Sequence, residues 1–364
     1  MRTDALPWHR ASWRRLADRV PAVSHFEFWP GWLFYAPIVA QWIVLGLRHG
    51  DMSLPTAANP RIETGGLCGE SKSAILDLVA PAQRDLLAPY ACIPAADADA
   101  AERAMATAGL DWPVIAKPDI GCNGAGVRLL ADRAALARYL TEFPPGEALV
   151  LQRYVPDEGE AGIFYVRHPG EAHGRITSLT FKQAPRVVGD GRSTLETLVR
   201  ADPRAGRIPD MYLPHLGARR TEVPAAGERV RLVLVGNHCK GSIFHDGRDD
   251  ITPALTRRVD AMLRAVPDFH FGRLDVRFDT LAALRRGEGF TVFEINGVGS
   301  EAIHVWDART RLRDAWTDQL WHYRTAFAIG RAQRARGHPS SGLRAMYRAF
   351  RRQQRLMTRY PLHD

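Results

Sequence analysis

The chain has 364 residues, of which 46% are hydrophobic, and its 49 Lys and Arg outnumber its 40 Asp and Glu, for a formal charge of +9. This length allows two or three lobes, and the composition excludes a collagen-like, disordered or disulfide-stapled chain. Its four cysteines lie far apart without a C-x-x-C pair, which argues against a zinc site and fits a reducing, cytoplasmic compartment. No cleavable signal peptide is apparent.

The positive charge is concentrated at the two ends of the chain. Residues 331–364 hold nine Arg and one Asp, and residues 1–25 hold five Arg and two Asp, whereas the rest of the chain is nearly neutral. A basic C-terminal helix is typical of a solvated surface, and contact with anionic lipid is the alternative. A nucleic-acid partner rests on charge alone and is not expected.

Lysine is rare in this chain. Of the 49 basic residues 45 are Arg, and the four lysines are Lys72, Lys117, Lys182 and Lys240. A lysine is a compact point charge that reaches a phosphate oxygen without the width of a guanidinium group. Each lysine is therefore a candidate for a specific role.

The first ninety residues form a distinct N-terminal region. Residues 12–20 read as a short basic helix, and residues 28–47 are twenty residues without a charge, rich in aromatic residues and interrupted by Pro30 and Pro37. Three interpretations of 28–47 stay open: a buried hairpin or helix, an interfacial aromatic anchor, and a membrane span. The stretch G65-G-L-C-G-E-S-K72 then leads into a predicted helix at 73–87. It is either a substrate loop with Glu70 or Lys72 pointing inward, or a capped helix start.

From about residue 110 onward, short strands alternate with amphipathic helices, which is typical of an α/β chain. Strands are predicted at 112–117, 126–130, 147–155, 161–168, 175–183, 229–236, 271–279 and 289–296. Helices are predicted at 132–142, 252–266, 308–330 and 341–358. Residues 187–199 read as a strand, an Asp-Gly turn and a helix capped by Ser193.

The first motif, K117-P-D-I-G-C-N-G-A-G126, is a strand that ends in a lysine, followed by a loop with three glycines. Glycines let backbone N–H groups close on phosphate oxygens, and the lysine adds a fixed positive charge. The spacing differs from the Rossmann and P-loop patterns, and the loop leads into a strand. It indicates a phosphate loop of another kind or a plain glycine-rich hairpin.

The second motif combines R273-L-D-V-R-F with the later E294-I-N. Because side chains alternate along a strand, Arg273, Asp275 and Arg277 share one face, and Val292, Glu294 and Asn296 share another. If the two strands pair, Asp275, Glu294 and Asn296 converge on one side. Three oxygen ligands of this kind suit a hard cation such as Mg2+. An ordinary half-exposed hairpin with ion pairs is the alternative.

A third stretch, L151-Q-R-Y-V-P-D-E-G-E160, places a carboxylate just after a strand edge. Together the three stretches and the V187-V-G-D-G-R-S-T-L-E-T-L198 run resemble the ATP-grasp superfamily over residues 110–300. The resemblance is closest to D-alanine–D-alanine ligases and cyanophycin-synthetase-like carboxylate–amine ligases. It implies an α/β fold whose α+β lobes sandwich a nucleotide. The lobes would be about 112–185 and 186–330 within a domain at 91–330, between an atypical N-terminal region and a basic C-terminal helix at 331–364.

The resemblance also implies roles for individual residues. Lys117 and Lys182 correspond to the lysines that reach the nucleotide phosphates, and Arg273 to the arginine that steadies the transferred phosphate. Asp275, Glu294 and Asn296 match ligands of Mg2+, with two ions expected and Mn2+ as a substitute. The mobile flap over the phosphates comprises Gly121, Cys122, Asn123, Gly124, Ala125 and Gly126.

The adenosine contacts follow from the same resemblance. Arg153 and Val155 fall where the hinge meets adenine, and Glu160 falls where a carboxylate takes the ribose. Gln152 stands where these ligases commonly have Glu, and its amide oxygen is expected to accept the same bond from adenine. His238, Cys239 and Lys240 are candidates for the substrate pocket.

The implied reaction is ATP-dependent: a substrate carboxylate becomes an acyl phosphate, and an amine displaces the phosphate to form an amide. The expected partners are therefore a small-molecule carboxylate and amine, ATP and Mg2+. The competing hypothesis is a non-catalytic nucleotide-binding protein at the membrane surface. A cytoplasmic location, peripheral to the inner face of the membrane if lipid is contacted, is expected in both cases.

Overall fold

The computed structural model describes residues 23–95, 97–233 and 241–361. Its first lobe is a four-stranded antiparallel sheet of order β1-β4-β2-β3, covered by α4 (Ala98–Thr107) and α5 (Arg133–Glu142). The strands are β1 (Tyr90–Pro94), β2 (Val114–Pro118), β3 (Arg128–Leu130) and β4 (Ala148–Arg153). Apolar side chains of the helices, such as Met105 and Leu136, pack on Val114 and Leu149 and exclude water from this core.

The second lobe is a five-stranded antiparallel sheet of order β11-β10-β5-β6-β9. Its strands are β5 (Gly159–Val166), β6 (Arg175–Gln183), β9 (Ile243–Asp246), β10 (Phe271–Phe278) and β11 (Phe290–Asn296). One face of the sheet packs against α8 (Pro253–Arg264) and joins a large apolar core. The other face carries charged side chains. The short helices η8 (Arg248–Asp250), α9 (Leu281–Arg285) and η9 (Ile303–Trp306) connect these strands or follow them.

The predicted α/β class with α+β lobes is confirmed, but the boundary between the lobes is different. Residues 159–183 form β5 and β6 and belong to the second sheet, whereas the sequence analysis placed them in the first lobe. The strand pattern predicted both strands well, because alternation reports local structure. It does not report which sheet a hairpin joins.

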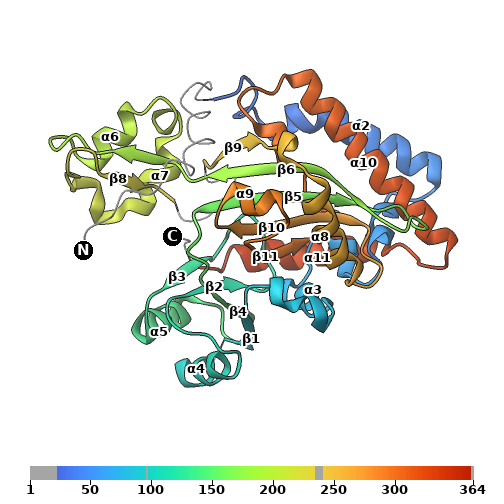
Figure 1. Cartoon of the computed structure of the whole chain (residues 1–364), viewed down its shortest axis with the longest axis horizontal. Helices are drawn as coiled ribbons and strands as arrows, with labels where there is room; N and C mark the ends of the chain where they lie inside the picture. The colour runs from blue at the N-terminus through green and yellow to red at the C-terminus, as the bar shows by residue number, and fades with distance from the viewer. Residues whose placement is uncertain (1–22, 96, 234–240, 362–364) are drawn as a thin grey trace.

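A small subdomain lies beside the second lobe, at the left of Figure 1. It contains β7 (Arg186–Val188), α6 (Leu195–Ala201), η5 (Ala205–Arg207), α7 (Pro209–Leu216), η6 (Gly217–Thr221) and β8 (Arg229–Arg231) around its own apolar core. Helix α6 is capped by Thr194, which accepts from the N–H of Thr197, and not by Ser193 as predicted. Ser193 instead donates to Asp190 in the preceding turn.

The N-terminal region is not a separate lobe, because it wraps around the second one. Residues 28–47 lie almost wholly in one helix, α2 (Gly31–His49), which runs alongside α10 (Leu312–Ala335; Figure 1). Of the interpretations left open for 28–47, the hairpin is excluded and a helix is present. The predicted helix at 73–87 is also shorter: α3 (Lys72–Asp77) ends before Pro81, which starts η4 (Pro81–Leu86). The short helices η2 (Leu54–Ala58) and η3 (Glu63–Gly66) precede it.

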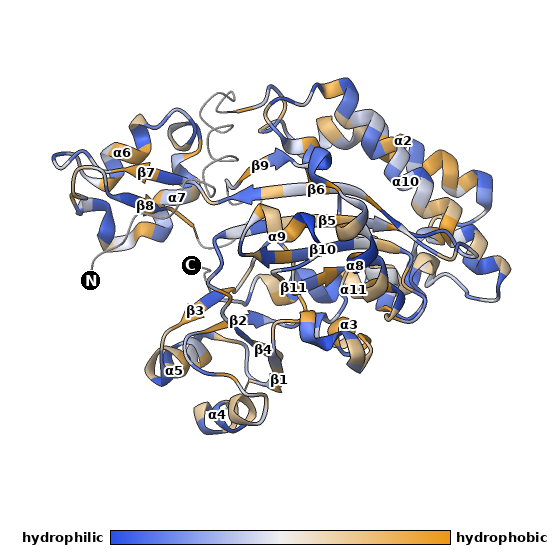
Figure 2. Ribbon diagram, viewed as in Figure 1, coloured by the Kyte–Doolittle hydropathy of each residue, from blue (hydrophilic) through white to orange (hydrophobic). Residues whose placement is uncertain are grey.

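The C-terminal region contains α10 (Leu312–Ala335) and α11 (Gly342–Met357). Helix α10 continues past residue 330, so the predicted boundary at 330/331 falls inside it. Helix α11 turns back toward the cleft between the lobes and buries Ala349, Gln353 and Leu356. Figure 2 shows polar residues interspersed with apolar ones along α10, whereas α2 is apolar over most of its length. The predicted helix at 12–20 and the candidates His238, Cys239 and Lys240 lie outside the described residues.

Candidate active site

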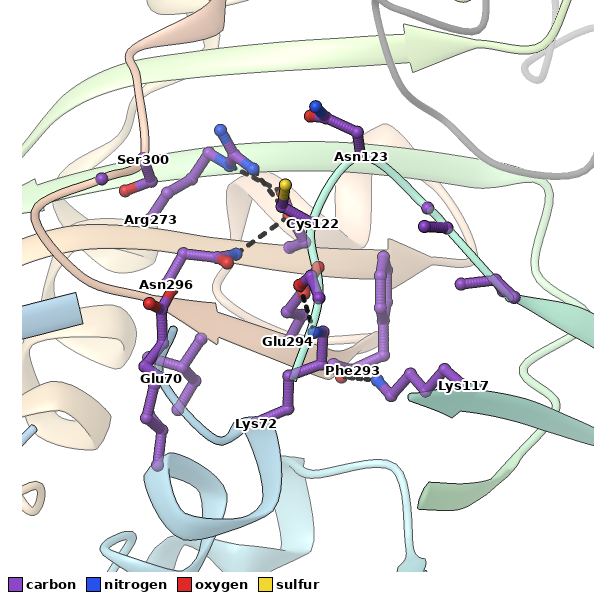
Figure 3. Close-up of a pocket in the computed structure, with 18 of the residues that line it drawn as sticks. Glu70, Lys72, Lys117, Cys122, Asn123, Arg273, Phe293, Glu294, Asn296 and Ser300 are labelled. Atoms are coloured by element: carbon purple, nitrogen blue, oxygen red, sulfur yellow. Dashed lines mark hydrogen bonds and ion pairs between the residues drawn. The ribbon is translucent and has the colours of Figure 1, made fainter. Parts of the chain in front are cut away.

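A cavity of about 560 Å3 lies between the two sheets. Strands of both lobes line it, together with the glycine-rich loop, the loop before α3 and one side chain of α11. Of the predicted site residues that the structure describes, all but Gly126 line this cavity. Figure 3 shows Arg273 and Asn296 on one side of the site and Lys117 on the other, with Cys122 and Glu294 between them.

The second motif converges through the pairing of β10 with β11, as predicted. Asp275 lies opposite Glu294, and Arg273 lies opposite Asn296. The register then shifts, so that Val276 pairs with Val292 and Phe293 is an extra residue on β11. The expectation that Val292 shares the face of Glu294 is therefore wrong. This bulge breaks the alternation, so Val292 belongs to the core while Phe293 and Glu294 both line the cavity.

Asp275 lies at the centre of a buried charge network. Nε and Nη2 of Arg273 donate to its two oxygens at 2.9 and 3.0 Å, and Nζ of Lys182 lies 2.9 Å from Oδ1. Burial alone would raise the pKa of Asp275, but the positive charges of Arg273 and Lys182 lower it well below its ordinary value. Asp275 is therefore ionised and holds both cations in place.

Glu294 and Asn296 present oxygens to the cavity beside Asp275. Within the described chain, Glu294 makes no hydrogen bond or ion pair through its side chain, and Asn296 uses its Nδ2 to donate to Asp275 at 3.3 Å, which leaves its Oδ1. Two carboxylates and an amide oxygen form a donor set that fits Mg2+ or Mn2+ completed by phosphate oxygens and water. The described residues contain no cluster of three His, Cys, Asp or Glu side chains able to hold a metal alone. A divalent cation bound here would therefore need the amide oxygen of Asn296 in addition to the two carboxylates.

Lys117 connects the two lobes. Its Nζ donates to Gln152 Oε1 at 2.8 Å within the first sheet and to the carbonyl of Phe293 at 3.0 Å on β11. Burial is the main cause that lowers the pKa of Lys117 to about 8, with the charge of Lys72 adding to it. Lys117 is therefore charged at neutral pH but close to its titration range.

Gln152 and Glu160 are both bonded to other residues of the chain. The amide of Gln152 is occupied, because Oε1 accepts from Lys117 and Nε2 donates to the carbonyl of Ala88 at 3.2 Å. Glu160 lies on β5, where it is ion-paired with Arg277 at 2.9 Å and with Lys182 at 3.4 Å. As the chain stands, Gln152 orients Lys117, and Glu160 balances the cations of the cavity floor. The sequence singled out Arg277 only as a neighbour of Asp275.

The glycine-rich loop joins β2 to β3 as a hairpin connection, as the sequence predicted. Three residues of its backbone are left-handed: Asn123 (φ 55°), Gly124 (φ 69°) and Gly126 (φ 70°). These positions explain the glycines and the asparagine, because other residues adopt this conformation at a cost. The loop thereby directs a tight stretch of backbone over the cavity.

The start of α3 supports one side of this loop. Asp119 accepts from the backbone N–H of Ser73 at 2.8 Å, and Nζ of Lys72 donates to the carbonyl of Gly121. Lys72 therefore belongs to the site, although it contacts the loop backbone and not a carboxylate. The sequence offered a signal for this, since Lys72 is one of only four lysines.

Helix α11 supports the other side. Gln353 donates to Cys122 Sγ at 3.2 Å and accepts from the N–H of Gly69 at 2.6 Å, so it bridges the two loops. Tyr360, just after α11, donates to the carbonyl of Ile120 at 2.7 Å. The C-terminal helix is therefore a structural part of the site. Sequence reasoning missed it because its arginines drew attention to its outer face.

The loop 65–70 reaches the cavity by packing backbone against backbone. N–H groups of Val298 and Gly299 donate to the carbonyls of Gly65 and Gly66 at 3.1 and 2.7 Å. A Cβ at Gly297 would lie 2.3 Å from the Gly65 carbonyl oxygen, so only glycine fits there. The contact brings Glu70 to the cavity. The predicted capped helix start is present as well, because Ser71 accepts from the N–H of Ala74 at 3.0 Å and caps α3.

Glu70 is an acidic group that forms no ion pair with another described residue. Its Oε2 is buried and has no hydrogen-bond partner among those residues. Burial raises the pKa of Glu70. A backbone hydrogen bond and the charge of Lys72 oppose this effect, and the negative charges of Glu294 and Glu63 make smaller contributions that raise the pKa further. A positively charged group bound next to Glu70 and Glu294 would offset the repulsion between these two carboxylates.

The cavity also extends to a more apolar part, which the sequence did not predict. Tyr35 of α2, Phe244 of β9, Ile303 and Trp306 line it there. Tyr35 donates to the carboxylate of Glu301 at 3.0 Å, and Arg273 donates to the backbone carbonyl of the same residue at 3.1 Å. The aromatic N-terminal region therefore supplies part of the cavity wall.

No protein-family model matches the sequence, and a search of curated proteins found no significant match. Among solved structures, the chain is similar to a D-alanine–D-alanine ligase from Bacillus anthracis (12% identity, 75% of this chain and 70% of that one, TM-score 0.41). It is also similar to the D-cycloserine synthetase DcsG (16%, 71% and 70%, TM-score 0.39). A third similar structure is a bifunctional glutathione synthetase from Pasteurella multocida, with 16% identity and a TM-score of 0.35. The match covers 69% of this chain but only 38% of that enzyme, so the chain spans well under half of its length. Because these TM-scores are below 0.5, functional conclusions depend on the cavity itself.

Proposed function

We propose that the chain is an ATP-grasp ligase that activates a carboxylate with ATP and joins it to an amine. The observation that carries this proposal is the arrangement of Arg273, Asp275, Glu294 and Asn296 on paired strands, facing Lys117 and a left-handed glycine loop across one cavity. Such a set suits a polyphosphate and a hard cation. It lacks the nucleophile–base pairs of a hydrolase.

The nucleotide would lie between the sheets with its phosphates under the glycine-rich loop. Lys117 and Lys182 supply positive charge to phosphate oxygens, and backbone N–H groups of the loop add donors. The backbone of residues 153–155 is the better candidate for adenine, because the amide of Gln152 is already occupied. A divalent cation held by Asp275, Glu294 and Asn296 would neutralise the phosphates when bound.

The chemistry would proceed in two steps. An oxygen of the substrate carboxylate attacks the γ-phosphorus, the bond to the β,γ-bridging oxygen breaks, and ADP leaves. The amine then attacks the acyl carbon, the bond to the phosphate oxygen breaks, and the amine proton passes to water or released phosphate. Arg273 is placed beside the cavity to stabilise negative charge on the transferred group.

The acidic groups favour a positively charged substrate. Glu70 and Glu301 line the cavity as carboxylates in addition to the predicted cation ligands. An ammonium group would provide the ion-pair partner that the buried oxygen of Glu70 lacks among the described residues. We therefore propose that at least one substrate carries an ammonium group, as an amino acid or peptide does.

The test is release of ADP from MgATP in the presence of a panel of carboxylates and amines, with products identified by mass spectrometry. Glu294→Gln should lower turnover at least about a hundredfold, because it removes a charged oxygen from the cation site. Glu288→Gln is the matched control, since Glu288 is exposed and pairs with Arg286. A Glu294→Gln protein that turns over as fast as the wild type would contradict the proposal.

A second measurement separates catalysis from simple nucleotide binding. With the carboxylate alone, reversible acyl phosphate formation should scramble isotope between the bridging and non-bridging oxygens of labelled ATP. A protein that binds ATP but neither scrambles the label nor releases ADP with any substrate pair would instead be a non-catalytic nucleotide-binding protein.

A further inference from the structure

Helix α2 has an outer face that the protein does not cover. Its apolar side chains Trp32, Val39, Ile43, Val44 and Leu47 are exposed, with exposed fractions of 74% for Trp32 and 70% for Leu47. They recur about every turn on the side opposite the buried Phe34 and Ile38. Five large apolar residues on one exposed helix face exceed what scattered surface residues explain. We call this set the α2 apolar face.

The inner side of the same helix is held firmly by the protein. Gln41 donates to the carbonyl of Leu320 at 2.7 Å, Trp42 donates to that of Met52 at 3.0 Å, and Trp316 donates to that of Phe34 at 3.0 Å. Trp42 also packs on Tyr323 and Phe327 of α10. Although α2 is long and apolar enough to cross a bilayer by composition, these bonds fix it along the protein surface.

Positive charge lies at the C-terminal end of the α2 apolar face. Helix α2 contains no Asp or Glu, and it ends in Arg48 and His49. Arg324 and Arg331 are exposed on α10, and Arg331 is near enough to His49 that its charge helps to lower the pKa of that imidazole, after burial. The C-terminal end of the apolar face is therefore basic.

We propose that the α2 apolar face docks on the surface of an anionic lipid bilayer, with α2 parallel to the membrane plane. An amphipathic helix with apolar side chains on one face and arginines beside it binds lipid in this way, through apolar burial and attraction to anionic headgroups. A second copy of the chain fits less well, because a two-fold contact pairs a surface with itself and would bring no negative charge to these arginines.

This docking goes beyond the ligase reaction and does not depend on it. Tyr35, on the same helix, lines the cavity, so a membrane under α2 would lie close to the apolar end of that cavity. The chain would then carry out its chemistry next to the bilayer surface.

The experiment is co-sedimentation of the full chain with phosphatidylcholine vesicles that contain or lack phosphatidylglycerol, at low and high salt. The wild type should bind the anionic vesicles and be weakened by salt. Trp32→Ser/Ile43→Ser/Leu47→Ser should lower binding at least about tenfold. Arg48→Gln/Arg331→Gln should lower binding and weaken its salt dependence. If the triple variant fails to fold, vesicle binding by the arginine variant is the test of the proposal.

The matched control lies on α11, whose Tyr347 and Phe350 are also exposed among arginines. Tyr347→Ser/Phe350→Ser should leave vesicle binding unchanged. The proposal is overturned if the wild type does not sediment with anionic vesicles, if the α2 variants bind as well as the wild type, or if the α11 variant loses binding to the same extent. A wild-type dimer in gel filtration that the triple variant abolishes would also overturn it, because the face would then be a contact between copies.

Discussion

Lys117 combines two tasks in one side chain. It holds the first lobe to the second through the Phe293 carbonyl, and it offers a positive charge to the cavity. Burial makes that charge costly, which lowers the pKa of Lys117 to about 8. The charge is therefore present below about pH 8 and is lost above it.

Nucleotide affinity should depend on pH for this reason. Phosphate binds the protonated lysine, so the dissociation constant for MgATP should be nearly constant below about pH 8. Above this it should rise by up to about tenfold per pH unit. Calorimetric titration across this range measures the effect. Lys117→Arg stays charged and should bind with a flat profile, even if more weakly. The same pH dependence in both proteins would show that another group is responsible.

The sequence predicted which residues lie together in the site better than it predicted the hydrogen bonds and ion pairs between them. Asp275, Glu294 and Asn296 converge because alternation and strand pairing are local rules that a sequence displays. The partners of Gln152 and Glu160 were not predictable, since Ala88 and Arg277 come from other parts of the chain. The bulge at Phe293 was also invisible, because one extra residue in a strand leaves the composition unchanged.

At the scale of elements, the site depends on loops that support one another. The glycine-rich loop lies between the start of α3 and the end of α11, through Asp119 on one side and Gln353 and Tyr360 on the other. The loop 65–70 in turn packs on the turn that follows β11. Movement of the flap would therefore require changes in contacts with α11.

The contact between the loop 65–70 and the turn that follows β11 depends on Gly297. Its replacement by Ala would put Cβ 2.3 Å from the Gly65 carbonyl oxygen, and backbone on both sides leaves no side chain to yield. We expect Gly297→Ala to lower the free energy of unfolding by about 3 kcal/mol and to displace Glu70 from the cavity.

Urea unfolding measures this effect, and Gly31→Ala is its control. Gly31 is at the exposed start of α2, where an added methyl group would meet no atom nearer than 4.0 Å. Ala should therefore be neutral there or stabilising by up to about 0.5 kcal/mol. Equal unfolding midpoints for Gly297→Ala and the wild type would mean that the two loops are not in close contact.

At the scale of the whole molecule, a buried ion pair attaches the small subdomain to the N-terminal region. Arg204 forms two hydrogen bonds with the carboxylate of Glu27, one of them at 3.1 Å, and both side chains are buried. Arg204 also donates to the carbonyls of Gly241 and Ser242 just before β9. Three segments distant in sequence therefore meet at one guanidinium group.

Removing one partner of this pair should lower the stability of the chain more than replacing both partners does. Glu27→Gln leaves the Arg204 charge buried and should destabilise the chain by about 3–5 kcal/mol, whereas Glu27→Gln/Arg204→Met should recover part of the loss. Denaturant unfolding measures both. Glu196→Gln breaks an exposed pair with Arg200 and should cost no more than about 0.5 kcal/mol. Equal effects of Glu27→Gln and Glu196→Gln would contradict a buried, structural pair.

Local sequence patterns predicted most strands and helices and the charged residues of the cavity, but not β1, β9, α4 or the apolar part of the cavity wall. Periodicity, glycine placement and rare lysines are properties of short segments, and short-range geometry is encoded in them. Only the tertiary structure decided that β5 and β6 join the second lobe, that α11 supports the glycine-rich loop, and that α2 leaves an apolar face outside. These features are contacts between segments far apart in the chain, and an apolar helix looks the same in sequence whichever side is covered.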